Sequence, residues 1–137
     1  DIPGLFNSEG RAATFDGRSP NKGPEPEGLT LGLVNGMTWA FVGLERVGGV
    51  MIFDVTDPND PGFIDYINTG EIAPEGMTFV SAGDSPTGVP LLFVGYEVSS
   101  QIGVYAIVVP ETGHLAPLTL GLGLAVIGVR RSRQRAS

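Results

Sequence analysis

The chain contains an internal repeat of about 50 residues, and no other feature limits its possible folds as strongly. The segment 26–30, Pro-Glu-Gly-Leu-Thr, returns 48 residues later as Pro-Glu-Gly-Met-Thr at 74–78. The segment 41–45, Phe-Val-Gly-Leu-Glu, returns 52 residues later as Phe-Val-Gly-Tyr-Glu at 93–97, because the intervening turn is longer in the second copy. A period of this length, with several short apolar runs per unit, is typical of propeller blades.

The apolar runs between the turns read as short β-strands. The chain has 21 glycines and 11 prolines, too many for a helical protein, and they separate runs rich in Val, Ile, Phe and Leu. Asn35-Gly36 between two such runs is a strong hairpin signal. The predicted strands are 29–32, 38–44, 50–55 and 63–67 in the first copy and 77–80, 90–96 and 102–108 in the second.

These strands predict an all-β protein made of about two four-stranded propeller blades, followed by a C-terminal hydrophobic sorting helix. Residues 24–72 form one blade and residues 73–108 a second blade that stops one strand short, so 24–108 should give two stacked antiparallel sheets. Residues 1–23 are interpreted as the end of a preceding blade and a linker, with 12–16 as a candidate outer strand. Two blades cannot close a ring, and the chain starts at Asp1 without Met. We therefore expect the C-terminal piece of a longer protein, whose remaining blades complete the propeller.

The charges are divided unevenly along the chain. All fifteen acidic residues and only four basic ones lie within residues 1–113, so this part is strongly acidic and is not expected to bind nucleic acid. The other basic residues are the closing arginines Arg130, Arg131, Arg133 and Arg135. The absence of cysteine excludes a disulfide framework and a thiolate metal site.

Residues 109–137 have the character of a sorting or anchor signal. A short motif, Val109-Pro110-Glu111-Thr112-Gly113, precedes His114, an apolar run over 115–129 and the four arginines, which would act as a stop on the cytoplasmic side. As a helix the run would reach roughly 22 Å, short of the ~30 Å hydrocarbon core. We therefore expect a membrane segment that is removed or exchanged after export. The alternative is a packed C-terminal helix with a basic cap, which Pro117 and the glycines of the run disfavour.

Repeated glutamates mark one candidate site. In a propeller, the loop that enters the innermost strand and the turn between the second and third strands lie on the same face. Glu27 and Glu75 stand at the first position and Glu45 and Glu97 border the second, so these carboxylates are expected on one rim with Glu25 nearby. Such a cluster favours a hard cation, calcium or magnesium. The alternative is that each glutamate caps backbone amides in a repeated turn.

The remaining candidate residues have structural interpretations. His114 lies in the sorting segment, so a Ser-His-Asp site has no histidine within residues 1–113. Arg46 is the one cation placed to meet a phosphate at the rim, and an ion pair with Glu45 or Glu97 is its alternative role. The aromatic strand residues Trp39, Phe41, Phe53 and Phe93 are expected in the core between blades.

Several segments resemble the closing blades of the bacterial choice-of-anchor I family. The resemblance lies in residues 22–28, 41–46, 50–58, 73–79 and 103–105, and covers about residues 10–108. It implies a secreted surface protein whose propeller domain is joined to one of several anchoring signals. A binding or surface-structure module is thus implied. Because some members are labelled alkaline-phosphatase-like, the end of a metal-dependent phosphoesterase is the alternative.

The tail resembles two kinds of anchoring signal. Residues 109–113 are similar to the Leu-Pro-x-Thr-Gly sortase signal, with Val109 in place of leucine. They are also similar to the exosortase Pro-Glu-Pro signal, with Thr112 in place of the second proline, and the Gly-Leu alternation that follows is typical of that type. The resemblance implies a sorting enzyme, exosortase or sortase, as a partner and at least transient membrane anchoring at the cell surface.

Overall fold

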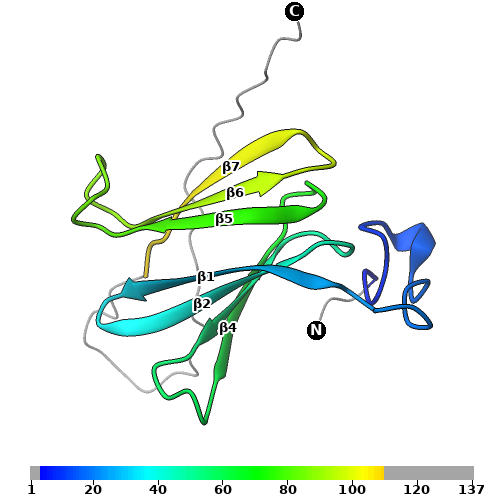
Figure 1. The fold of residues 1–137 in the computed structure, drawn as a ribbon, viewed down its shortest axis with the longest axis horizontal. Coiled ribbons are helices and arrows are strands. Elements are labelled where there is room, and N and C mark those ends of the chain that lie inside the picture. Colours follow the sequence, from blue (N-terminus) through cyan, green and yellow to red (C-terminus); the bar gives the residue numbers. More distant parts are fainter. Residues whose placement is uncertain (1–3, 110–137) are drawn as a thin grey trace, which may run out of the picture.

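The computed structural model describes residues 4–109, and their regular structure is almost entirely antiparallel β-sheet (Figure 1). The first sheet has the order β1-β2-β3-β4 and the second the order β5-β6-β7. The strands are β1 (Pro26–Val34), β2 (Met37–Leu44), β3 (Val50–Asp54), β4 (Gly62–Ile67), β5 (Pro74–Val80), β6 (Leu91–Tyr96) and β7 (Gln101–Ala106). The prediction of two antiparallel sheets from residues 24–108 is confirmed.

The first hairpin shows why the repeat has two offsets. Asn35 (φ 49°) and Gly36 (φ 82°) both have left-handed backbone, as a two-residue turn between twisted strands requires. Val34 and Met37 face each other directly across this turn. In the second copy a longer loop, residues 81–90, joins β5 to β6. The strands on either side nevertheless keep the same antiparallel pairing.

The two sheets stack face to face along β1 and β5, which lie side by side in Figure 1. A Cβ atom on Gly32 would lie 2.5 Å from the ring of Phe79, so only glycine admits that ring. The Phe79 ring stacks on Phe41 with a centroid separation of 5.6 Å. A Cβ atom on Gly43 would similarly lie 2.8 Å from the carbonyl oxygen of Pro74. Glycines in the first sheet therefore set how closely the second sheet approaches.

The core fills the space between these faces. Trp39 (1% exposed) and Phe41 (0%) are buried there, as the sequence predicts, whereas Phe53 and Phe93 are only partly buried. The Tyr96 and Tyr105 hydroxyls are 2.7 Å apart, and that of Tyr105 lies 3.0 Å from Thr69 Oγ1. The core residues are Val34, Trp39, Phe41, Val50, Ile52, Ile67, Leu92, Val94, Tyr96, Tyr105 and Ile107.

The N-terminal segment, residues 4–25, folds as turns beside the start of β1 (Figure 1). Residues 12–16 do not form the outer strand that was predicted for them, and Ala12–Thr14 instead form a 3-10 helix (η1). The reason is that local main-chain hydrogen bonds, such as that from the Phe15 N–H to the Ala12 carbonyl, close these residues into a turn. Within residues 4–109 no helix is long and apolar enough to cross a membrane. The expected sorting helix, the motif residues after Val109 and the four arginines lie outside the described residues.

Candidate functional site

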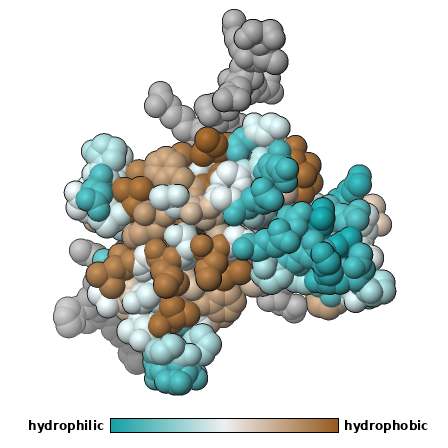
Figure 2. Space-filling view, viewed as in Figure 1, coloured by the Kyte–Doolittle hydropathy of each residue, from teal (hydrophilic) through white to brown (hydrophobic). Residues whose placement is uncertain are grey.

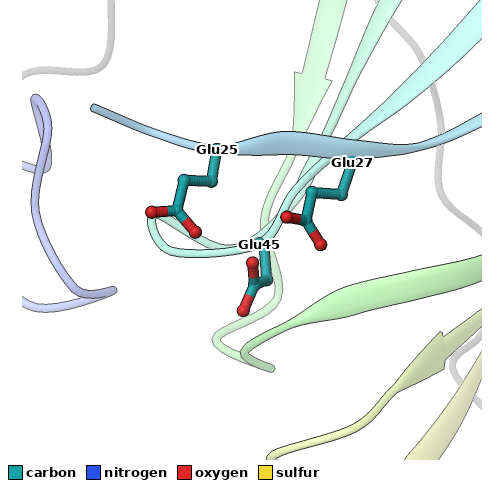
Figure 3. A group of neighbouring side chains, drawn as sticks. All are labelled: Glu25, Glu27 and Glu45. Carbon is teal, nitrogen blue, oxygen red and sulfur yellow. The ribbon is translucent and has the colours of Figure 1, made fainter. Parts of the chain in front are cut away.

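Three glutamates converge where β1 begins. Glu25 precedes β1, Glu27 is its second residue, and Glu45 follows β2, and one carboxylate oxygen from each lies within 4.8 Å of the others. Figure 3 shows the three carboxylates directed into the same space. Glu25 is buried (5% exposed), Glu45 is partly buried and Glu27 is exposed. The structure thus brings together two of the four predicted rim glutamates with Glu25.

Main-chain hydrogen bonds hold this arrangement. Glu25 has left-handed backbone (φ 50°), and its carbonyl accepts a hydrogen bond of 2.9 Å from the Glu45 N–H. The Pro24 carbonyl accepts one of 3.2 Å from the Arg46 N–H. These bonds fasten the chain entering β1 to the turn after β2. They therefore fix the relative positions of the carboxylates on both segments.

The second copy repeats this backbone but not the cluster. Ala73 also has left-handed backbone (φ 62°), and its carbonyl accepts a 2.9 Å hydrogen bond from the Glu97 N–H. Alanine thus stands where the first copy has Glu25. Glu75 and Glu97 are exposed and line a cavity of about 390 Å³. They do not belong to the three-glutamate group.

Two arginines lie against the glutamates. Arg46 donates from Nε to Glu25 at 3.1 Å, and its Nη2 lies 3.1 Å from Glu45. Arg18, from the N-terminal segment, forms an ion pair with the other oxygen of Glu25. The interpretation of Arg46 as an ion-pair partner of Glu45 is confirmed. The contact of Arg18 was not foreseen, because residues 4–25 lack the periodicity that would place them.

The cluster shifts the acidities of its members in opposite directions. Burial alone would raise the pKa of Glu25, but the Arg46 hydrogen bond and the charges of Arg18, Arg46 and Lys22 lower this pKa below its usual value. Burial raises the pKa of Glu45, and the negative charges of Glu27 and Glu25 add to the effect although Arg46 opposes it. Glu25 is therefore held ionised, while Glu45 is the easiest of this pair to protonate.

The geometry permits two chemical roles. Carboxylate oxygens are the ligands that calcium and magnesium prefer, and three glutamates within 4.8 Å supply several of them. However, Arg18 and Arg46 already neutralise part of this charge, and a cation would have to compete with them. The described contacts therefore favour a structural ion-pair network over a tight metal centre.

Comparison with known proteins points to the cell surface. Residues 1–58 match the model of the Choice-of-anchor I domain, which supports the family that the sequence resembles. The match includes all three clustered glutamates and both arginines. No solved structure matches the chain.

A relative among curated proteins is Gigasin-3a of Magallana gigas. It is 29% identical to the chain over 115 residues. The aligned region is 67% of this chain and 40% of Gigasin-3a. The chain thus spans about two fifths of the length of this relative.

Proposed function

We propose that the chain is a β-propeller module of an exported, cell-surface-anchored protein, in which it binds a partner or forms part of the surface structure. The coarser part of this proposal follows from the match to the Choice-of-anchor I domain, which indicates a cell-surface or extracellular protein. The propeller, the binding role and the anchor go further. The binding or structural role rests on the family resemblance, and the propeller and the anchor each have support of their own.

The observation that carries the propeller proposal is that the first sheet carries apolar residues on both faces. One face of β1 packs on the second sheet through Gly28 and Gly32, and the opposite face carries the exposed leucines Leu29, Leu31 and Leu33. Figure 2 shows apolar surface gathered over β1 and over the part of the first sheet that lies below β1 in this view. A strand that is apolar on both sides is usually covered on both sides. Further sheets of the same repeat, stacked in the same way, would cover this surface and close a ring.

The proposed anchor is residues 109–137. Its support is the likeness of Val109 to Gly113 to sortase and exosortase signals, together with the apolar run and arginines that follow. The proposed partners are accordingly a membrane and a sorting enzyme. The phosphoesterase alternative gains no support from the described rim, because Arg46 is paired with Glu25 and Glu45.

The location can be tested by treating intact producing cells with a protease that cannot enter them. We expect peptides from residues 4–109 to be released into the medium from live cells. A cytoplasmic enzyme of the same cells, which should stay intact, is the control for lysis. Protection of the protein in intact cells, with cleavage only after lysis, would contradict the surface location.

A further inference from the structure

We propose that three hydroxyl groups form a one-way hydrogen-bond chain that locks the linker between the two sheets, residues 68–73, onto the second sheet. Two of them belong to Tyr96 at the end of β6 and Tyr105 of β7, and the third belongs to Thr69 of the linker. Each hydroxyl donates its proton along the chain, which ends on the carboxylate of Glu71. This lock would exist whether or not the two sheets belong to a propeller.

The proton positions follow from the end of the chain. Thr69 Oγ1 donates to a carboxylate oxygen of Glu71, and a hydroxyl group has a single proton to donate. At the 3.0 Å contact between Thr69 and Tyr105, the proton must therefore come from Tyr105. At the 2.7 Å contact between the two tyrosine hydroxyls, it must for the same reason come from Tyr96. The negative charge of Glu71 thus sets the direction of the whole chain.

The surroundings of Tyr96 suit it to begin the chain as a donor. Burial raises the pKa of its hydroxyl, and the hydrogen bond to Tyr105 and the charge of Glu71 raise this pKa further, against a smaller opposing effect of Thr69. The Tyr96 hydroxyl therefore keeps its proton. At the other end of the chain Glu71 is buried, so the hydrogen bond that its carboxylate receives offsets part of the loss of water around it.

The first copy of the repeat lacks these hydroxyl groups. With the 52-residue offset, Tyr96 and Tyr105 correspond to Leu44 and Phe53, whose side chains are purely apolar. A sheet of this repeat therefore forms without hydroxyl groups at these two positions. The tyrosine hydroxyls are an addition of the second copy, where the linker supplies a carboxylate for the chain to end on.

A glycine makes room for the tyrosine pair. A Cβ atom on Gly103 of β7 would lie 2.9 Å from the Tyr105 hydroxyl and 3.0 Å from the Tyr96 ring. At the corresponding position the first copy has Met51, whose longer side chain would fill this space. The second copy thus changes three neighbouring positions together, two to tyrosine and one to glycine. Joint changes of this kind indicate that the hydroxyl pair is a built feature of the second sheet.

The lock acts on a segment that touches both sheets. A Cβ atom on Gly48, in the turn after β2, would lie 2.9 Å from the Glu71 carbonyl oxygen. The Ile72 N–H donates a 2.8 Å hydrogen bond to Ser99 Oγ, in the turn between β6 and β7. The linker therefore lies against a turn of each sheet. Holding Thr69 and Glu71 to the tyrosines fixes how the second sheet sits against the first.

Urea unfolding of the full chain tests the direction of the hydrogen bonds. Tyr105→Phe removes the middle hydroxyl and leaves the buried Tyr96 proton without its acceptor, so the unfolding equilibrium constant should rise at least about 10-fold. Tyr96→Phe removes only the first donor and leaves no proton without an acceptor, so the rise should be about 2- to 5-fold. Both variants keep the aromatic ring. Thr69→Ser, which keeps a hydroxyl in the chain, is the matched control and should change the constant little.

The double variant gives the decisive comparison. In Tyr96→Phe/Tyr105→Phe no tyrosine proton of the chain is left without an acceptor, so it should be more stable than Tyr105→Phe although it has lost one more hydroxyl. If the double variant were less stable than Tyr105→Phe, or if the two single variants were equal, the chain would not run one way and the proposal would be wrong. Should Tyr105→Phe fail to fold, recovery of folding on adding Tyr96→Phe would support the proposal, and its absence would contradict it.

Amide hydrogen exchange tests the lock on the linker. In Tyr105→Phe we expect exchange of the Ile72 N–H to accelerate by a larger factor than exchange of the Val55 N–H, which donates a 2.9 Å hydrogen bond to the Thr38 carbonyl in the first sheet. Equal acceleration of both amides would mean that the substitution only lowers the overall stability, and the lock would be refuted. Unchanged exchange at Ile72 would refute it as well.

Discussion

Glu25 connects three parts of the molecule at the scale of a single residue. Its backbone carbonyl holds the turn after β2 through Glu45, and its carboxylate pairs with Arg46 on that turn and with Arg18 of the N-terminal segment. The side chain is buried, so losing its charge would weaken the ion pairs of both Arg18 and Arg46 and leave Arg46 with Glu45 alone. We therefore expect this residue to matter more for stability than the exposed Glu27.

The pH dependence of stability should reveal the role of Glu25. Because its pKa is lowered in the folded state, it stabilises the protein above its ordinary pKa of about 4.3, and this contribution disappears as pH falls through the folded value. Glu25→Gln should therefore lower the melting temperature clearly at pH 7 and make little difference well below pH 4. Thermal unfolding followed by circular dichroism measures this, with Glu75→Gln, at an exposed glutamate outside the group, as control. An equal loss at every pH would contradict the ion-pair role.

Divalent cations should bind the glutamate group only weakly. The ion would have to compete with Arg46 for Glu25 and Glu45, so we expect a calcium Kd of about 10⁻³ M or weaker. Calorimetry should show this binding weaken further in Glu27→Gln and remain unchanged in Glu75→Gln, whose residue lies outside the group. Affinity in the micromolar range, or no response to Glu27→Gln, would count against this proposal.

The sequence predicts part of this site, and the rest depends on an irregular segment. Glu27 and Glu45 could be identified because the repeat returns both of them, as Glu75 and Glu97, at the same places beside the strands. Glu25 could be added because it lies two positions before Glu27. The prediction of a four-glutamate rim stays untested. Ala73 nevertheless stands where the first copy of the repeat has Glu25, so the two copies share a backbone conformation there but not a carboxylate. Arg18 could not be identified, because its position depends on turns rather than on periodic packing.

At the scale of the strand, the repeat predicts where each element lies with little error. All seven predicted strands are present, and β1 and β5 extend further towards their N-termini than the apolar runs suggest. The reason is that Pro26 and Pro74 start strands whose first residues pair across an irregular register with the ends of β2 and β6. An apolar pattern does not signal such polar strand starts.

Two equivalent glycines should respond in opposite ways to the same substitution. Gly28→Ala places a methyl group 2.7 Å from the Glu75 carbonyl oxygen and should cost about 1–3 kcal/mol of unfolding free energy. In Gly76→Ala the added methyl group meets none of the residues 4–109, so the change should be neutral or stabilise by up to about 1 kcal/mol, since alanine restricts the unfolded chain. Urea unfolding at low protein concentration measures both. Equal effects would mean that the sheets are not packed as described.

At the scale of the whole molecule, the proposed anchor makes a prediction about the mature protein. An apolar segment too short to span a membrane comfortably is expected to be cut or exchanged once export is complete. Mass spectrometry of the protein from its producing cells should find a C-terminus near residues 109–113, with or without an attached group. A mature chain that still ends at Ser137 would refute processing.

Trp39 is the one tryptophan of the chain, and it is buried where the two sheets meet, in the cluster that includes Leu92 and Val94 of the second sheet. The fluorescence of its indole should therefore respond to separation of the two sheets more directly than to unfolding of either sheet alone. Fluorescence emission at short wavelength marks the closed pair, and a red shift marks entry of water between them. The protein carries its own optical reporter of inter-sheet opening, which can be followed without any label.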